Sequence, residues 1–333
     1  MVLHIRKPNT GESIGFSPVF CMPGTLGEYG DGYAWYSRVR LMGIGSDRVS
    51  FVSPTATVRP KTPNGRDRPA VDEKKPAEAV SFPTSGHVLA PTKTRKPCVW
   101  EMFFQQRWQL LNDPFIISFS PEGETADDAV AAGWAFAQDF LLQYFERPHG
   151  RFVADFAVRV GLENPAPGET HGAYAERVGD ILSALSPLRE AGIPVIAGFG
   201  GSAPAKAVAS LQDLCDAVWL AGGIPWGTEG VDWKRFATQK QGGVPVSPIR
   251  SKGGEEDGML YGPDCYKLAV DAVDSAKMAG VTLPIIAGNG IHRPEDVDLL
   301  RFAGASAIAI GTDAFLRPLA TKAVVSRARE TFL

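Results

Sequence analysis

The chain has 333 residues with a net charge of −3, and 44% of its residues are hydrophobic. This balance is typical of a globular protein and argues against one that binds nucleic acid through a basic face. No apolar run approaches the ~18 residues of a membrane span, and residues 1–8 lack the apolar core of a secretory signal. The four cysteines are far apart, which predicts reduced thiols in a cytoplasmic protein. The 36 glycines and 26 prolines predict many tight loops.

Short apolar runs mark the expected strands. From residue 114 onward, each run is followed by a segment with apolar residues at helical spacing. Helices are expected after Thr125 as N-cap, over residues 171–190, 203–214 and 263–278, from the turn containing Pro294, and at the C-terminus. The strands are expected at residues 18–21, 49–52, 115–119, 152–160, 194–197, 216–220, 283–287 and 307–310.

Alternating strands and helices, with strands that are apolar throughout, predict a parallel sheet covered by helices. Eight such units favour an α/β fold, a single-domain (β/α)8 TIM barrel over residues 1–333. A doubly wound open sheet is the alternative. Residues 56–98 break the rhythm with prolines and charged residues. We expect there a long irregular excursion after the second strand, either a solvated loop without regular helix or a cover over the active site.

Two glycine turns near the end of the chain indicate a ligand site. Residues 287–291 follow the seventh expected strand, and Gly311 and Thr312 close the eighth. Barrel enzymes place their sites at the carboxyl ends of the strands, and phosphate groups commonly bind near the last two. Glycines let a phosphate approach backbone N–H groups at a helix start, so the pattern favours phosphate binding. The alternative is that these glycines only make short turns.

The same residues carry a resemblance to a known family. Residues 283–312, with Gly288-Asn289-Gly290-Ile291 and Ile310-Gly311-Thr312, resemble the flavin-phosphate site of dihydroorotate dehydrogenases. Residues 253–263, 18–25 and 55–69 are similar to that family's glycine-rich loop before the seventh helix and to its first two strand-end turns. The resemblance implies a barrel that binds FMN. The cofactor-binding residues that it implies here are Gly24, Gly288, Asn289, Gly290, Gly311 and Thr312.

The chain departs from the family where the reacting groups would lie. The family's catalytic base, a Cys or Ser, aligns with Glu163, and its flavin-contacting lysine after the fifth strand aligns with Gly198. The family's lysine after the second strand aligns near Pro54. Its asparagine after the sixth strand aligns within residues 221–223, where this chain has Ala-Gly-Gly. The amides that would hydrogen-bond a planar pyrimidine are therefore missing, so we do not expect dihydroorotate as the substrate. No obvious residue replaces the positive charge of the lysine beside the flavin.

Four side chains near the expected barrel mouth are candidates for chemistry. Glu163 would be a general base if the mouth buried it, and is otherwise a solvated carboxylate. Arg159 would bind a substrate carboxylate through two hydrogen bonds, and otherwise forms an ion pair at a strand end. Asn164 matches a family asparagine only after a shift of one residue, and would contact the substrate. Trp226 would pack on substrate or flavin, and otherwise closes over the core.

We therefore expect an FMN-dependent oxidoreductase that resembles dihydroorotate dehydrogenase, of the CH–CH donor class by that resemblance, acting on another small molecule. One alternative is a non-redox lyase or isomerase on a phosphorylated substrate, since the phosphate turns would serve it equally well. A second is a flavin-binding protein without turnover. The expected partner is a small-molecule substrate, with no metal, nucleic acid or membrane, and a homodimer is left open as the assembly.

Overall fold

The structure is a computed structural model of the 333-residue chain. It describes residues 2–22, 49–53, 55–57, 80–82, 84–90, 98–99, 112–121, 123, 125–146, 152, 154–162, 164–166, 168–237, 239–241, 244–252, 257–311 and 316–332.

Eight parallel strands form a barrel. Each strand pairs with the next in chain order, and the last pairs with the first. The first two are joined by a parallel bridge between Phe20 and Ser50, which closes the ring. The barrel strands are β3 (Val19–Cys21), β4 (Phe51–Val52), β9 (Phe115–Phe119), β10 (Phe156–Gly161), β11 (Val195–Gly198), β12 (Ala217–Leu220), β17 (Ile285–Gly288) and β18 (Ala307–Ile310). The predicted (β/α)8 barrel is confirmed. Each expected run overlaps one of these strands, and β10, β11 and β17 extend one residue beyond their runs.

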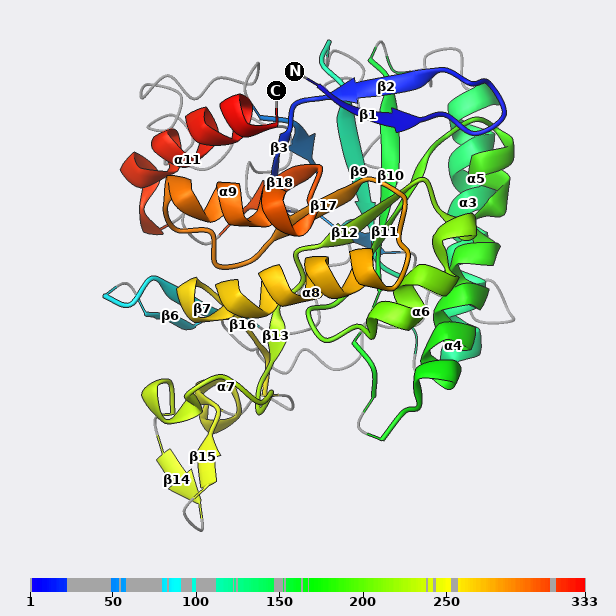
Figure 1. The fold of residues 1–333 in the computed structure, drawn as a ribbon. Helices are drawn as coiled ribbons and strands as arrows, with labels where there is room; N and C mark the ends of the chain where they lie inside the picture. The colour runs from blue at the N-terminus through cyan, green and yellow to red at the C-terminus, as the bar shows by residue number, and fades with distance from the viewer. Residues whose placement is uncertain are drawn as a thin grey trace.

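Helices cover the outside of the barrel (Figure 1). They are α3 (Ala126–Glu146), α4 (His171–Ala184), α5 (Ser186–Glu190), α6 (Ala205–Ser210), α8 (Tyr266–Met278), α9 (Pro294–Ala303) and α11 (Pro318–Thr331), with the 3-10 turns η3 (Gln212–Leu214) and η5 (Pro263–Cys265). The segment 171–190, expected as one helix, is two. Pro187 explains the break at Leu185, because it offers no backbone N–H to the preceding turn and its ring crowds the carbonyl four residues earlier.

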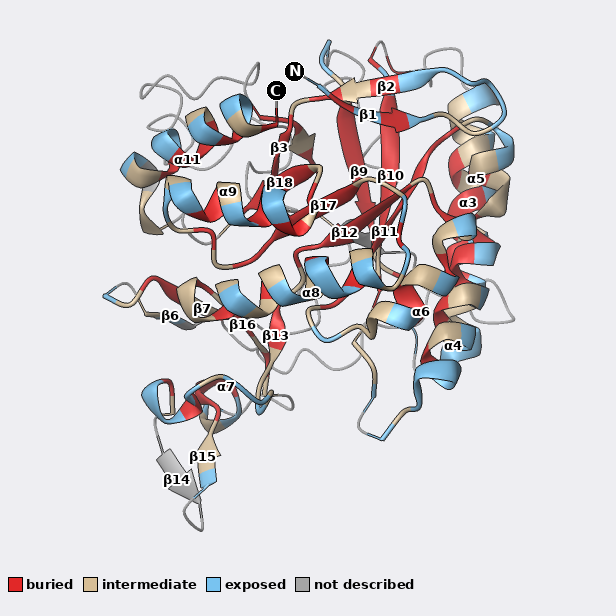
Figure 2. Cartoon of the chain, viewed as in Figure 1, coloured by how far each residue is buried: buried red, intermediate tan, exposed pale blue. Residues whose placement is uncertain are grey.

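Apolar side chains fill the barrel interior and one of its ends. An N-terminal hairpin, β1 (Leu3–Arg6) with β2 (Ser13–Phe16), directly precedes β3 and lies across the amino-terminal end of the barrel (Figure 1). Its residues Ile5 and Phe16 are fully buried in one cluster with the inward-facing Phe20, Ile116 and Trp219. Figure 2 shows burial along the strands and exposure on the outer faces of the helices. Since this hairpin closes the amino-terminal end, a ligand site is left to the opposite mouth.

A small antiparallel sheet stands beside that mouth. The stretch expected to be an irregular excursion contains the hairpin β6 (Val80–Phe82) and β7 (His87–Ala90). This hairpin pairs with β16 (Met259–Tyr261), which pairs with β13 (Ile224–Pro225). Short-range patterns could not indicate this pairing, because its partner strand lies about 170 residues further along the chain. The remaining elements are β5 (Ala56–Thr57) and β8 (Cys98–Val99), which extend the barrel sheet, η4 (Trp233–Arg235), and a projecting unit of β14 (Gln239–Gln241), β15 (Val244–Val246) and α7 (Pro248–Ser251).

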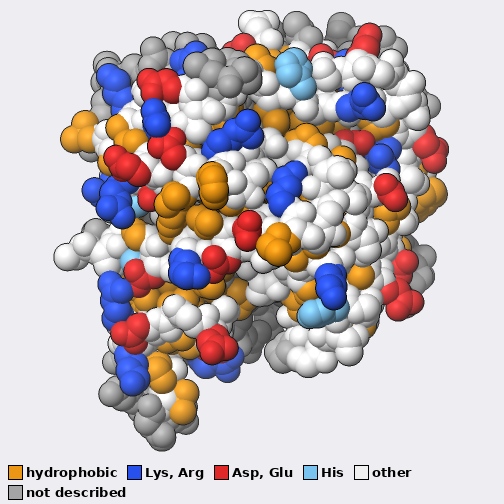
Figure 3. Space-filling view, in the orientation of Figure 1, with side chains coloured by type: hydrophobic (Ala, Val, Ile, Leu, Met, Phe, Trp, Pro, Cys, Tyr) orange, Lys and Arg blue, Asp and Glu red, His pale blue; other side chains and the backbone are white. Residues whose placement is uncertain are grey.

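The surface carries interspersed charges of both signs on the face shown in Figure 3. Some large apolar side chains are also exposed, and Phe302 on α9 has 92% of its surface accessible. Among the described helices, none combines the length and the apolar character needed to cross a bilayer.

Candidate functional site

The turn after β17 forms a cradle of backbone groups. Asn289 and Gly290 both have positive φ angles, 79° and 81°. A Cβ on Gly290 would lie 2.6 Å from the carbonyl oxygen of Gly262 and 2.6 Å from the backbone nitrogen of Tyr266. Only glycine fits this close approach. Among the hydrogen bonds of the described residues, none uses the N–H of Gly290 or Ile291. These two donors are therefore available to an anion.

The start of α9 fixes the cradle from the other side. The carboxylate of Asp296 accepts hydrogen bonds from the N–H groups of His292 (2.7 Å) and Arg293 (2.8 Å). This is a capping arrangement, in which a side chain satisfies donors that a helix start leaves open. Arg317, just before α11, contacts the ring of His292. The guanidinium of Arg317 thus lies against the residue that directly follows the two donors of the cradle.

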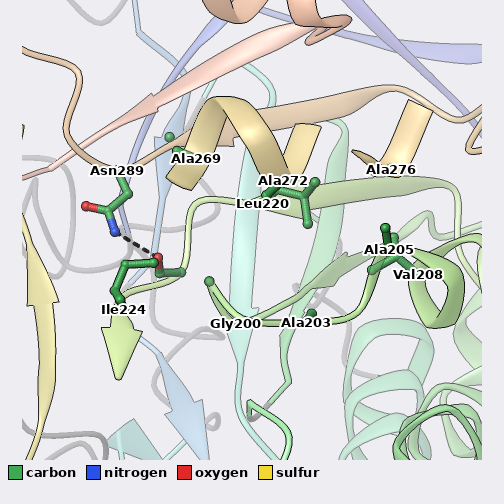
Figure 4. Close-up of a pocket in the computed structure, with 13 residues that line it drawn as sticks. Gly200, Ala203, Ala205, Val208, Leu220, Ile224, Ala269, Ala272, Ala276 and Asn289 are labelled. Atoms are coloured by element: carbon green, nitrogen blue, oxygen red, sulfur yellow. Dashed lines mark hydrogen bonds between the residues drawn. The ribbon is translucent and has the colours of Figure 1, made fainter. Parts of the chain in front are cut away.

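The side chain of Asn289 braces the cradle rather than facing a ligand. Its Oδ1 accepts a hydrogen bond from the N–H of Gly262 at 3.2 Å. Its Nδ2 donates to the carbonyl of Gly222 at 3.0 Å, the bond drawn as a dashed line in Figure 4. Asparagine is also one of the few residues that tolerate a positive φ. One side chain therefore ties the turn after β17 to the segments after β12 and after β16.

Two small pockets adjoin this brace. The first, which we name the cradle pocket, is lined by Met22, Ala221, Tyr261, Gly262, Asn289, Gly290, Ile291, Ala309, Ile310 and Gly311. The second is lined mainly by glycines and small apolar side chains and lies between α6, α8 and the ends of β11 and β12 (Figure 4). The cradle pocket combines the unused donors with the carboxyl ends of β3, β12, β17 and β18. It is the better candidate for a ligand with an anionic end.

Arg159 on β10 points into the barrel and is only 8% exposed. Its guanidinium donates to Ser118 Oγ at 3.1 Å and lies 5.1 Å from the centre of the Trp219 ring. Ser118 Oγ in turn shares a hydrogen bond of 3.2 Å with Thr55 Oγ1. Among the described residues no carboxylate pairs with Arg159, so the expected alternative of an ion pair at the strand end has no support there. Burial lowers the pKa of the guanidinium to about 10.

The guanidinium occupies the space beside Gly198. A Cβ on Gly198 would lie 2.9 Å from both Cζ and Nε of Arg159. Gly198 is the position where the resemblance places a lysine. The sequence showed no evident replacement for that charge, but the neighbouring strand β10 supplies one. A side chain at position 198 and an inward-pointing arginine at 159 exclude each other, which explains why glycine stands here.

Tyr261 connects Arg159 to the cradle pocket. Its ring lies against Gly223, where a Cβ would come within 2.6 Å of Cζ of the phenol. Burial raises the pKa of Tyr261, and the nearby charge of Arg159 opposes that shift. Ala221, two residues after Trp219 on the same strand run, lines the pocket as well. The cradle pocket therefore begins directly above the layer that holds Trp219 and the guanidinium.

Two other predicted site residues, Asn164 and Trp226, contact neighbouring loops. Asn164 accepts hydrogen bonds at Oδ1 from the N–H (3.0 Å) and hydroxyl (2.7 Å) of Ser202, so it braces the turn after β11. Trp226 packs on Trp233 with ring centres 4.7 Å apart and lines neither pocket. Three predicted site residues lie outside the described residues, so their surroundings are not described: Gly24, Glu163 and Thr312.

Sequence reasoning did not single out Trp219 or Tyr261. Strand alternation places Trp219 inward, and a bulky indole among the small side chains of β12 was the available signal. Tyr261 had no local signal, because its position depends on the pairing of β16 with β7 and β13. Within the described part of the chain, no group of His, Cys, Asp or Glu side chains is arranged to hold a metal ion.

These observations define the class of the protein as a (β/α)8 barrel, with open backbone N–H groups in the turn after its seventh strand. The chain matches no protein-family model and no curated protein. Among solved structures it is similar to DHODH from Eimeria tenella in complex with ferulenol, with 15% identity and a TM-score of 0.59 over 99% of this chain and 83% of that one. It is also similar to ligand-free DHODH from Eimeria tenella, with 16% identity and a TM-score of 0.55 over 99% of this chain and 86% of that one. The chain has the fold of these dihydroorotate dehydrogenases, which confirms the resemblance as one of fold.

Proposed function

We propose that this protein is an FMN-dependent oxidoreductase acting on a small molecule other than dihydroorotate. The observation that carries the proposal is the continuity between the cradle and the buried guanidinium. A cofactor with an anionic phosphate at one end and a ring that becomes anionic on reduction needs positive or N–H-rich surroundings at both ends. The cradle offers the N–H groups of Gly290 and Ile291, and the barrel centre offers Arg159.

The residues that would hold FMN follow from this arrangement. The phosphate would lie on the backbone of the turn after β17, together with Gly311 and the adjacent Thr312, and the first strand-end turn would contribute Gly24. Asn289 would act through its backbone, because its side chain braces Gly262 and Gly222. When bound, FMN supplies hydride transfer to or from a substrate carbon.

Side chains of the protein itself would bind the substrate and accept its proton. Glu163, in the run after β10, is the proposed proton acceptor. Asn164 and Trp226 are proposed to border the substrate, Asn164 by fixing the turn after β11. Residues 221–223 carry no amide side chain, so this face lacks the groups that would pair with a planar pyrimidine. These features support a substrate different from dihydroorotate.

The same cradle also suits the phosphate of a substrate in a non-redox lyase or isomerase, and it suits a flavin-binding protein without turnover. A visible spectrum separates the first of these from the proposal, since bound FMN absorbs at about 450 nm. The purified protein should be yellow, or should take up added FMN on titration. A colourless protein that does not take up FMN would refute the proposal.

A pair of glycine variants tests the location of the phosphate. We expect Gly290→Ala to weaken FMN binding at least tenfold, because the added Cβ meets Gly262 and Tyr266. Gly280→Ala is the matched control: Gly280 has a φ of 98°, but its Cβ would meet nothing within 4 Å. Equal affinity of the two variants for FMN would show that the cradle does not hold the phosphate.

Turnover is tested at Glu163. Once a substrate has been found by screening the photoreduced protein, Glu163→Gln should lower the rate by a factor on the order of 10²–10⁴, the usual contribution of a general base. A rate within about threefold of the wild type would remove Glu163 from this role. FMN binding that persists without turnover of any screened compound would favour the non-catalytic alternative.

A further inference from the structure

The barrel centre holds two buried donors without acceptors. Among the described residues, Nε of Arg159 and Nε1 of Trp219 are buried and make no hydrogen bond. Both belong to the same layer, because the guanidinium lies over the indole with 5.1 Å between Cζ and the ring centre. Among the described residues, the guanidinium donates its hydrogen bond to a neutral hydroxyl, that of Ser118. The layer is therefore rich in positive charge and N–H donors and has no anion among the described residues.

Such an arrangement costs stability. A buried charge without an opposite charge is strongly unfavourable, and each buried donor without an acceptor has lost its hydrogen bonds to water without replacement. Other arginines of this chain avoid that cost: Arg189 pairs with Asp216, with Nη2 3.0 Å from a carboxylate oxygen. Buried polar groups without a partner are rare in native structures, and a group that binds there is one explanation for them. An anion or an acceptor-rich group at this layer would satisfy both donors.

The position of the layer limits what that group can be. The hairpin β1–β2 closes the amino-terminal end of the barrel, so a ligand reaches the layer only from the mouth. The cradle pocket lies directly above it, because Ala221, two residues beyond Trp219 on the same strand run, lines that pocket. The deepest part of a ligand whose phosphate lies on the cradle is thus the part that meets the guanidinium.

We propose that Arg159 and Trp219 form a buried anion site that accepts the negatively charged pyrimidine edge of reduced FMN. This inference rests on the proposed function, in which FMN lies across the mouth with its phosphate on the cradle. It differs from the sequence-based prediction that Arg159 binds a substrate carboxylate. A substrate approaching from the solvent side would meet the flavin ring first, whereas the guanidinium is 8% exposed and lies beneath the pocket. The positive charge would favour the reduced over the oxidised cofactor.

The test compares the affinities of the protein for oxidised FMN and for FMN reduced with dithionite. Arg159→Met removes the charge and keeps the length of the side chain. We expect it to weaken the binding of reduced FMN relative to oxidised FMN at least tenfold, equivalent to lowering the two-electron potential by about 30 mV. Arg159→Lys keeps the charge and should leave the ratio within about threefold of the wild type. Trp219→Phe removes the indole N–H together with the five-membered ring that carries it, and should shift the ratio in the same direction by about threefold.

Stability separates a binding role from a structural one. The cofactor-free Arg159→Met protein should be at least as resistant to urea as the wild type, because an uncompensated buried charge is gone. Arg189→Met, the matched control, should be less stable, because it leaves Asp216 without its partner, and its FMN ratio should stay unchanged.

The outcomes distinguish the two proposals. Wild-type protein that binds no oxidised FMN would overturn the proposed function and this inference together. Normal binding of oxidised FMN, with an unchanged affinity ratio in both Arg159→Met and Trp219→Phe, would overturn only the anion site and would return Arg159 to the role of a substrate ligand. Arg159→Met that loses as much stability as Arg189→Met would show that the guanidinium is structural. If Arg159→Met does not fold, Trp219→Phe decides. An unchanged affinity ratio in Trp219→Phe would then show that the guanidinium is structural, and a threefold shift would support the anion site.

Discussion

Replacing Asn289 by alanine should loosen the whole site, because this one side chain joins three segments. The variant loses the hydrogen bond from the N–H of Gly262 (3.2 Å) and the one to the carbonyl of Gly222 (3.0 Å). The Gly262 donor is buried, so its loss of a partner costs about 1–3 kcal/mol, while water can partly replace the second bond. Alanine at a φ of 79° adds about 1 kcal/mol. The expected destabilisation is about 2–4 kcal/mol.

Equilibrium unfolding in urea, followed by circular dichroism, measures this loss. Asn289→Gly is the control that separates the two causes, because glycine adopts the positive φ freely but makes neither hydrogen bond. It should be about 1 kcal/mol more stable than Asn289→Ala and still well below the wild type. A loss of less than about 1 kcal/mol in Asn289→Ala would refute the bracing role. Equal stability of the two variants would refute the argument from backbone strain.

Three further predictions concern other parts of the site. Burial lowers the pKa of His87 below its usual 6.5, although Asp264 partly opposes the shift. Below pH 6.5 the unfolded chain therefore binds more protons than the folded one. The contribution of His87 to stability is full above about pH 6.5 and falls as the pH drops from there through the folded-state pKa. His87→Gln should flatten this dependence in urea unfolding at a series of pH values, and an unchanged slope would contradict it. Asp296→Ala removes the acceptor at the start of α9 and should lower the free energy of unfolding by about 0.5–2 kcal/mol in the same assay. An unchanged free energy of unfolding would contradict the capping role of Asp296. Gly198→Ala should displace the guanidinium of Arg159 and lower the affinity for reduced FMN as Arg159→Met does; an affinity ratio like the wild type's would show that the guanidinium is not confined there.

The local patterns of the sequence determined the barrel. Each strand lies within a short run of apolar residues, such as 115–119, because strands buried on both faces need no polar side chains. The turn after β17 was also predictable, since Gly-Asn-Gly between a strand and a helix indicates positive φ angles and open N–H groups. These features depend on residues that are close together in the chain, and that is why the residue pattern alone was sufficient.

The chemistry of the barrel centre was decided only by the tertiary structure. The sequence shows an arginine at 159, a glycine at 198 and a tryptophan at 219 as three unrelated positions, and it indicates no replacement for a lysine at 198. Parallel pairing of β10, β11 and β12 brings the three residues into one layer, where the guanidinium lies in the space that Gly198 leaves open. Register between distant strands is set by the packing of the whole barrel, so a charge moved from one strand to its neighbour is visible only once the strands are assembled.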